Sequence, residues 1–198
     1  MAKTRLFITE KNLHEGMSIS VSGGDFEYLS KVMRKKVGDQ IMIFNGLDGE
    51  FEAVISEIEK KHLSAIVEKQ VSELHKVPNI TLAFALVKNV RVDFIAAKAT
   101  ELGVAKFQPI VTRRTIVDKV NLDRFRANIK EACEQCERND MPQVFEVQKL
   151  DKFLSDAKTA EKILILCDES GCGKKASELL SDLHRNYPKI SEKEIVIL

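Results

Sequence analysis

Three continuous apolar runs constrain the fold of this chain most strongly. They are ITLAFALV at 80–87, KILILC at 162–167 and EIVIL at 194–198. A strand that is apolar on both faces is typical of a parallel sheet that is covered on both sides. Helical periodicity lies between and after these runs, over Val90–Gly103, Leu122–Asn139 and Lys175–Asn186. The alternation predicts an α/β domain with a mostly parallel sheet.

The first part of the chain has a different rhythm. Five short segments are enriched in Val, Ile and Phe, namely Arg5–Thr9, Met17–Val21, Gln40–Phe44, Glu50–Ile58 and Leu63–Val71. Asn45-Gly46 and Asp48-Gly49 indicate a hairpin, because both pairs tolerate positive φ. One short helix is predicted over Asp25–Lys36. These features predict a small β-barrel. We place the domain boundary near Pro78, with a first domain over 1–75 and a second over 76–198.

Composition excludes several classes of protein. Hydrophobic residues make up 44% and charged residues 31%, which is typical of a folded globular chain. The apolar runs are much shorter than the roughly 20 residues of a membrane span. The N-terminus has no apolar signal core, and the 4 cysteines are expected to be free thiols in a reducing compartment. We therefore expect a cytoplasmic protein without a membrane segment.

Local charge is more informative than the net charge of +1. Between Lys88 and Lys130 the chain carries ten basic and four acidic side chains. Such an excess predicts a local site for an anion, and phosphate is the anion that most often recruits Arg and Lys. A solvated helix face is the alternative, and charge alone favours neither.

The predicted helix over Leu122–Asn139 has a polar stripe beside its apolar one. The polar stripe consists of Arg124, Asn128, Glu131, Gln135 and Arg138, and Asn121 is a plausible N-cap. These groups could bind phosphate or fix neighbouring loops by charge-assisted hydrogen bonds. The alternative is an exposed face with helix-spaced ion pairs, which is the commoner case for an isolated helix.

Lys98 shares one side of the preceding helix with Ile95 and Leu102, which we expect to face the protein. A buried lysine needs a partner. Lys98 therefore either pairs with Glu101 or lines a cleft, and we give the two equal weight.

Motifs for metals and nucleotides are incomplete. Cys133 and Cys136 lie on the apolar stripe of a helix, so core thiols are favoured over a zinc site. The segment GCGKK at 171–175 lacks the first glycine and the Ser or Thr of a Walker motif, which favours a surface turn. No metal site is expected.

Three ordered segments resemble those of a single family. The first has YLSKVMR at 28–34, GD at 38–39 and FNG at 44–46. The second has KATELGV at 98–104, then Pro109 and Arg113-Arg114. The third has EACEQCERN at 131–139, then Pro142. Together they resemble the RsmE-type 16S rRNA uracil-N3 methyltransferases of the SPOUT class.

This resemblance implies a PUA-like RNA-binding β-barrel followed by a SPOUT-type α/β trefoil-knot methyltransferase domain. It also implies S-adenosylmethionine as methyl donor, a homodimer, and 16S rRNA in the small ribosomal subunit as partner. The implied catalytic residues are Arg138, Glu131 and Gln135. The implied RNA-binding residues are Arg34, Lys35, Lys88, Arg91, Lys98, Arg113, Arg114 and Arg124. The implied residues bordering the cofactor are Leu166, Cys167, Ile197 and Leu198.

Members of the family continue after the strand at 194–198 with glycine-rich I-G-P-E-G-G and L-G-x-R segments that build the knot. Neither segment lies within the 198 residues. We therefore expect a domain that is incomplete at its C-terminus and inactive without those segments. A non-catalytic RNA-binding remnant is the alternative, and an unrelated α/β nucleotide-binding protein is a weaker one. In the complete enzyme, Arg138→Ala is expected to lower methyl transfer while leaving the fold intact.

Overall fold

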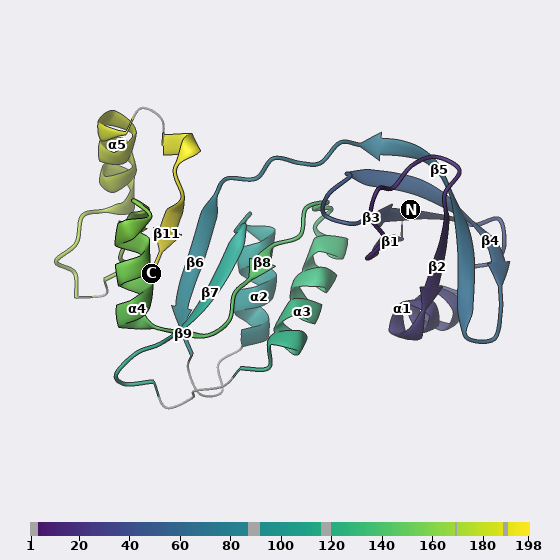
Figure 1. Ribbon diagram of the computed structural model, residues 1–198, viewed down its shortest axis with the longest axis horizontal. Helices are drawn as coiled ribbons and strands as arrows, with labels where there is room; N and C mark the ends of the chain where they lie inside the picture. Colours follow the sequence, from purple (N-terminus) through teal and green to yellow (C-terminus); the bar gives the residue numbers. More distant parts are fainter. Residues whose placement is uncertain (1–3, 87–91, 116–119, 169, 188–189) are drawn as a thin grey trace. The chain divides into compact units, whose positions relative to one another are not determined.

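A computed structural model describes residues 4–86, 92–115, 120–168, 170–187 and 190–198 (Figure 1). The chain forms two compact units. Unit 1 comprises Met1–Lys76 and Lys130–Met141, and unit 2 comprises Val77–Ile129 and Pro142–Leu198. Each unit has its own sheet.

Unit 1 contains a curved five-stranded sheet in the order β1-β3-β4-β5-β2. Its strands are β1 (Arg5–Phe7), β2 (Ser18–Ser22), β3 (Gln40–Phe44), β4 (Glu50–Ile58) and β5 (His62–Ser72). β1 and β3 pair in parallel, and the other pairs are antiparallel. The β4–β5 pairing shifts register at three points, and such bulges bend a sheet. The five strands expected from the sequence are confirmed.

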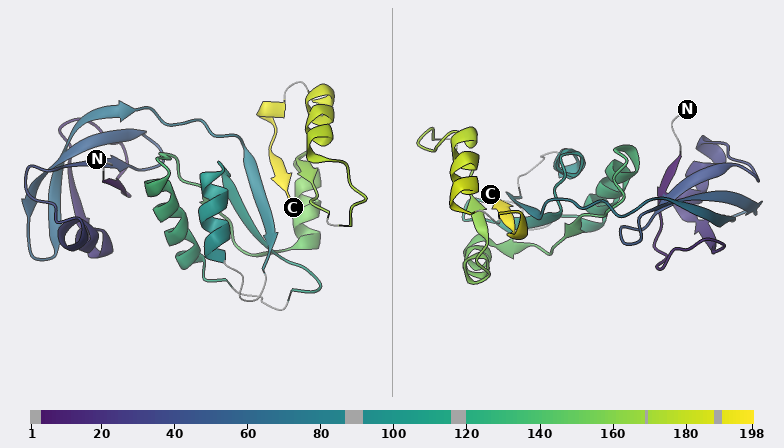
Figure 2. Two further views of the ribbon diagram at one scale, coloured as in Figure 1. Left: turned by 180° about the vertical axis from the view of Figure 1, so that it is seen from behind. Right: turned by 90° about the horizontal axis from the view of Figure 1, so that it is seen from above.

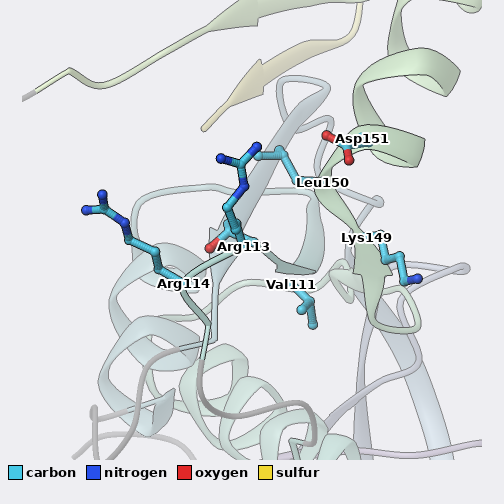
Figure 3. Close-up of a pocket in the computed structure, with 7 residues that line it drawn as sticks. Val111, Arg113, Arg114, Lys149, Leu150 and Asp151 are labelled. Carbon is cyan, nitrogen blue, oxygen red and sulfur yellow. The ribbon is translucent and has the colours of Figure 1, made fainter.

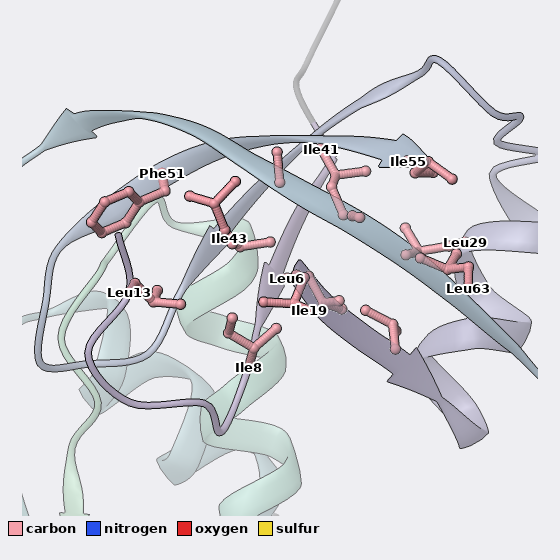
Figure 4. Close-up of a cluster of buried hydrophobic side chains, with 14 of the residues drawn as sticks. Leu6, Ile8, Leu13, Ile19, Leu29, Ile41, Ile43, Phe51, Ile55 and Leu63 are labelled. Atoms are coloured by element: carbon pink, nitrogen blue, oxygen red, sulfur yellow. The ribbon is translucent and has the colours of Figure 1, made fainter. Parts of the chain in front are cut away.

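The core of unit 1 lies on the concave side of this sheet (Figure 4). Leu6, Leu29, Ile43, Ile55 and Leu63 are almost completely buried there. Removing their apolar surface from water stabilises the unit, at about 25 cal/mol for each Å².

The helix expected over Asp25–Lys36 is shorter and less regular. α1 covers Gly23–Glu27 and continues as a π-helical turn, η1, over Tyr28–Val32. Arg34 then adopts a left-handed conformation with φ 52°, and the Lys35 amide donates to the Leu29 carbonyl. This bond spans six positions, one more than the closing bond of a Schellman C-cap, because the turn before it is π-helical, and it ends the helix.

α3 (Leu122–Gln135) also ends before the predicted limit at Asn139, and Glu137 follows with φ 61°. Arg5 caps this end within unit 1. Its guanidinium donates to the carbonyls of Cys133 at 2.7 Å and Arg138 at 3.2 Å, and to the Glu50 carboxylate at 2.6 Å. The last carbonyls of a helix otherwise have no partner.

The compact units of the structure divide the chain differently from the expected domains. The segment Lys130–Met141 was placed in the second domain, but it packs with the N-terminal unit. Besides the Arg5 contacts, the Lys130 ammonium pairs with Asp25 at 2.6 Å. Gly46 has φ 77°, and a Cβ there would lie 2.9 Å from Cβ of Met141. Only glycine therefore allows this close approach.

Unit 2 contains a parallel sheet in the order β10-β11-β6-β7-β8, and β9 also pairs with β7. Its strands are β6 (Ile80–Ala85), β7 (Lys106–Val111), β8 (Gln143–Val144), β9 (Gln148–Lys149), β10 (Ile163–Ile165) and β11 (Ile195–Ile197). Its helices are α2 (Val92–Glu101), the first part of α3, α4 (Leu150–Thr159) and α5 (Ala176–Asn186), with a 3₁₀ turn, η2, at Ile190–Glu192. The predicted parallel α/β architecture is confirmed.

Helices cover both faces of this sheet, with α2 and α3 on one side and α4 on the other (Figure 2). On the α3 side, Phe125 stacks on Phe84 with ring centroids 5.6 Å apart and meets Phe107 edge-on at 5.2 Å. On the α4 side, Phe153 belongs to a buried cluster that includes Val196 from β11 and Ile110 from β7.

The elements that the sequence pattern missed include α4 and the strands β7, β8 and β9. β7 contains Pro109, which argues against an interior strand because proline cannot donate to the ladder. On one side of β7, Pro109 lies in a gap between two partner strands. β7 pairs with β8 at its start and with β9 at its end, so no partner needs a hydrogen bond from the proline. The buried Gln108 side chain bridges the gap by donating to the Glu146 carbonyl at 2.8 Å.

Lys98 on α2 does not face the protein, so that expectation is wrong. Ala96, Ala99 and Thr100 form the buried side of the helix, while Leu102, at the expected inner face, is 83% exposed. The Lys98 ammonium instead pairs with Glu101 at 2.7 Å on the surface. Of the two expected roles of Lys98, pairing with Glu101 is therefore confirmed.

An ionic cluster joins four strands at the amino edge of the parallel sheet. The Glu194 carboxylate accepts hydrogen bonds from Thr81, Lys106 and Lys162, each at 2.8 Å. Burial acts to raise the pKa of Glu194, but these three hydrogen bonds together lower it to about 2. The cluster therefore favours the folded state only while Glu194 is ionised.

We predict that Glu194→Gln destabilises unit 2 by on the order of 2 kcal/mol at neutral pH. Because the folded-state pKa is depressed, the stabilisation is fully present above the unfolded pKa of about 4.5 and is lost as the pH falls through about 2. Urea unfolding of wild type and variant should therefore converge on acidification. Glu161→Gln, which removes an exposed partner of Lys193, is the matched control. A gap between wild type and Glu194→Gln that stays constant with pH would contradict this account.

Candidate functional site

The parallel register places the carboxyl ends of the strands of unit 2 at one edge of its sheet, where ligand sites of open α/β sheets form. A pocket of about 660 Å³ lies at this edge, where β7 ends and β9 leads into α4 (Figure 3). Two short segments line it, Val111–Arg114 and Lys149–Asp151.

A hydrogen-bonded turn presents two adjacent arginines to this pocket. The Thr115 amide donates to the Thr112 carbonyl at 3.1 Å, and the Thr112 amide donates to Oγ1 of Thr115 at 2.8 Å. The two hydroxyl groups are 2.9 Å apart. Arg113 and Arg114 occupy the two central positions of this turn, so its backbone is fixed directly beneath them.

Ion pairs within the chain account for most of the basic segment noted in the sequence. In the described part of 92–130, every basic side chain except Arg113 and Arg114 pairs with a carboxylate. The pairs are Lys98 with Glu101, Lys106 with Glu194, Arg124 with Asp93, Arg126 with Glu146, and Lys130 with Asp25.

Lys149, on the opposite side of the pocket, also has no ion-pair partner among the described residues. Three cationic side chains that have no counter-ion among the described residues therefore line one pocket, together with the carboxylate of Asp151. Such an arrangement favours an anionic ligand.

The residues expected to border a cofactor lie together at the carboxyl ends of β10 and β11. The Cys167 amide donates to the Leu198 carbonyl at 2.7 Å, and the Leu198 amide donates to the Ile165 carbonyl at 2.9 Å. Ile197 is the last residue of β11, and Leu166 is 68% exposed. This edge therefore offers an exposed apolar surface.

The three residues expected to be catalytic belong to unit 1. On the exposed side of α3, the Gln135 amide donates to the Glu131 carboxylate at 3.1 Å. Arg138 is only 7% exposed and binds both carboxylate oxygens of Asp140, at 2.7 and 2.6 Å. Although burial opposes it, the Asp140 carboxylate raises the pKa of Arg138. In this arrangement the Arg138 guanidinium serves a buried ion pair, and its catalytic role stays a prediction.

The other residues expected to bind RNA differ in whether their side chains already have partners within the chain. Arg34 is exposed, and the Lys35 ammonium donates to the Gln40 carbonyl at 3.0 Å. Lys98 and Arg124 are in the surface ion pairs described above. Lys88 and Arg91 lie outside the described residues.

Sequence reasoning missed Lys149 and Asp151 because no local pattern links them to Arg113 and Arg114. The parallel pairing of β7 with β9 is what brings Lys149 beside the end of β7, and the sequence analysis predicted neither strand. A pattern of Thr at 112 and 115 around two arginines could also have indicated a side-chain-stabilised turn.

The described cysteines are free thiols, as expected, but Cys136 is exposed because α3 ends at Gln135, so its expected place in the core is wrong. Cys133 is buried, and burial raises the pKa of its thiol to about 12. Among the described residues, no group of three or more His, Cys, Asp or Glu side chains is arranged to hold a metal ion. In the same part of the chain, no helix has both the length and the apolar character that crossing a membrane requires.

We predict that Arg138→Ala destabilises unit 1 by about 3 kcal/mol, because it leaves the Asp140 carboxylate buried without its counter-ion. This revises the expectation of an intact fold. Arg138→Lys should lower the stability of unit 1 by less, because it retains the positive charge. It should still lower it, because lysine cannot bind both oxygens of Asp140 as arginine does. Lys31→Ala, which removes an exposed partner of Glu27, is the control for charge removal in the same unit. Equal urea midpoints for Arg138→Ala and wild type would refute the structural role.

Comparisons with known proteins agree with this architecture. Residues 73–198 match the family model for the RNA methyltransferase domain, and residues 21–68 match that for the RNA methyltransferase PUA domain. The ribosomal RNA small subunit methyltransferase E of Rickettsia conorii is 33% identical over 72% of this chain and 58% of its own length. The corresponding protein of Bacillus subtilis is 27% identical over 82% of this chain and 66% of its own length.

A solved structure is also similar. The ribosomal RNA small subunit methyltransferase E of Neisseria gonorrhoeae, bound to S-adenosyl methionine, superposes with a TM-score of 0.82 at 26% identity, covering 99% of this chain and 78% of that one. The expected PUA-like barrel followed by a SPOUT-type methyltransferase domain is thereby confirmed. The chain spans between about half and two thirds of the length of the curated relatives it matches. It belongs to the RNA methyltransferase family, among the proteins of the RsmE type.

Proposed function

We propose that this protein methylates N3 of a specific uridine in 16S rRNA of the small ribosomal subunit, with S-adenosylmethionine as methyl donor. The relatives named as small-subunit methyltransferases support the substrate class. The observation that carries the proposal is the pocket at the carboxyl edge of the methyltransferase domain. It is lined by Arg113, Arg114 and Lys149, which pair with no carboxylate in the described part of the chain. RNA is the polyanion that such a site fits.

The carboxyl ends of β10 and β11 fit the donor. Leu166 provides exposed apolar surface, and Cys167, Ile197 and Leu198 are adjacent through the backbone hydrogen bonds described above. We propose that these four residues border S-adenosylmethionine, which supplies an electrophilic methyl group when bound.

The chemistry at the acceptor requires loss of the weakly acidic N3 proton of uracil. Cationic side chains near the base lower the free energy of the anion that develops as this proton leaves. We propose this role for arginines at the site, and we assign Glu131 and Gln135 to the acceptor side of the reaction. Arg138, held by Asp140, is proposed to position the end of α3 for them.

RNA contacts outside the pocket are proposed for two side chains of the first unit, the exposed Arg34 and the half-buried Lys35. Lys98 and Arg124 can contribute if phosphate displaces their surface carboxylate partners, because exposed ion pairs contribute little free energy. Lys88 and Arg91 are proposed from the sequence alone. We also propose a homodimer that acts on assembled small subunits in the cytoplasm.

The proposal predicts transfer of a labelled methyl group from S-adenosylmethionine to small subunits that lack the modification. The assay should use the product of the complete gene beside the 198-residue chain. Nucleoside analysis of the product should show uridine methylated at N3, and fully modified subunits serve as the control substrate. Methylation at another uracil position would refute the N3 assignment. Subunit binding without any transfer by either protein would favour a non-catalytic RNA-binding remnant.

A further inference from the structure

We propose that the pocket lined by Val111–Arg114 and Lys149–Asp151 binds a single phosphate-bearing nucleotide of the RNA, with Arg113 and Arg114 sharing its phosphate. The inference rests on the proposed function and deepens it, because it names the ligand of one pocket. S-adenosylmethionine is thereby assigned elsewhere, at the ends of β10 and β11.

The geometry of the turn supports a shared phosphate. Thr112 and Thr115 fix the backbone beneath the two arginines by three hydrogen bonds of 2.8 to 3.1 Å. Figure 3 shows the two side chains leaving the same turn with their guanidinium groups spread apart, and both side chains are exposed, so they are free to converge on one phosphate. Neighbouring guanidinium groups can each donate two N–H groups to phosphate oxygens, which is the geometry in which arginine binds phosphate most strongly.

Charge distinguishes a phosphate from the methyl donor. The pocket presents three cations and one carboxylate, and no described acidic residue pairs with Arg113, Arg114 or Lys149. The sulfonium group of S-adenosylmethionine is itself cationic and would be repelled. A phosphate would supply the negative charge that the two arginines lack.

The size and lining of the pocket fit one nucleotide. Small-molecule sites measure about 300–1,000 Å³, and this pocket measures about 660 Å³. The half-buried side chains of Val111 and Leu150 provide apolar surface for a base. N3 lies on the pairing edge of uracil, so methylation requires a nucleotide that is turned out of its helix. A pocket for one nucleotide meets this requirement.

Binding to the 198-residue chain tests the proposal directly. Uridine monophosphate, uridine, inorganic phosphate and S-adenosylmethionine are titrated separately, with two-dimensional NMR as the readout. We expect uridine to bind at least about tenfold more weakly than uridine monophosphate, because a charge-assisted contact contributes about a factor of ten. Inorganic phosphate should also bind more weakly, because it lacks the base.

Removing positive charge from the pocket and removing negative charge from it should change nucleotide binding in opposite directions. Arg113→Ala and Arg114→Ala should each weaken nucleotide binding about tenfold, and Arg114→Lys should weaken it less. Asp151→Asn should strengthen binding, because it removes the negative charge from the pocket. Lys174→Ala removes a cation of the same unit that pairs with Asp182, and should change nothing. Circular dichroism and thermal midpoints check that each variant is folded.

Several outcomes would overturn the proposal. They are equal affinities for uridine and uridine monophosphate, unchanged binding in both Arg→Ala variants, and displacement of uridine monophosphate by S-adenosylmethionine. Failure of the proposed function is distinguishable from these. Nucleotide binding by the 198-residue chain without methyl transfer by the product of the complete gene would refute the function and leave the pocket assignment intact. Transfer by the complete product without nucleotide binding at the pocket would refute the pocket assignment alone.

Discussion

Parallel strand pairing is the constraint on which the organisation of unit 2 depends. Because β6, β7, β9, β10 and β11 run in one direction, their starts meet at one edge and their ends at the other. The amino edge holds the Glu194 cluster, where one carboxylate offsets two lysines. The carboxyl edge holds the pocket and the exposed ends of β10 and β11. The Glu194 cluster and the pocket are thus separated by the length of the strands.

Ion pairing inside the chain decides which positive charges remain available to a ligand. A basic segment in a sequence has the same composition whether its side chains are free or neutralised. Here Asp93, Glu146 and Glu194 neutralise cations that are distant from them in the chain, up to 88 positions for Lys106 and Glu194. Within the described ranges, the two arginines of the Thr112–Thr115 turn form no ion pair, which concentrates the available charge at one pocket.

In unit 1, arginine has a structural role. Arg5 is buried over the Phe44 ring, with its guanidinium carbon 4.8 Å from the ring centroid, and binds the carbonyls at the end of α3. Arg138 is buried against Asp140 a few residues later. Both guanidinium groups satisfy backbone or carboxylate oxygens that would otherwise be buried without partners. The family motif around Arg138 therefore contributes to the fold, whatever its part in the reaction.

The sequence by itself determined the elements whose signals are local. The limits of β3 and β4 were predicted to the residue, and Asn121 caps α3 by accepting from the Arg124 amide at 2.9 Å. Its motifs also identified the family, and the alternation of apolar runs predicted the parallel sheet. Only the tertiary structure decided that Lys130–Met141 belongs with the barrel, that β7 accommodates Pro109, and that Lys149 lies across a pocket from Arg113. These depend on contacts between residues far apart in the chain, and no local periodicity encodes the carboxylate that each distant lysine or arginine meets.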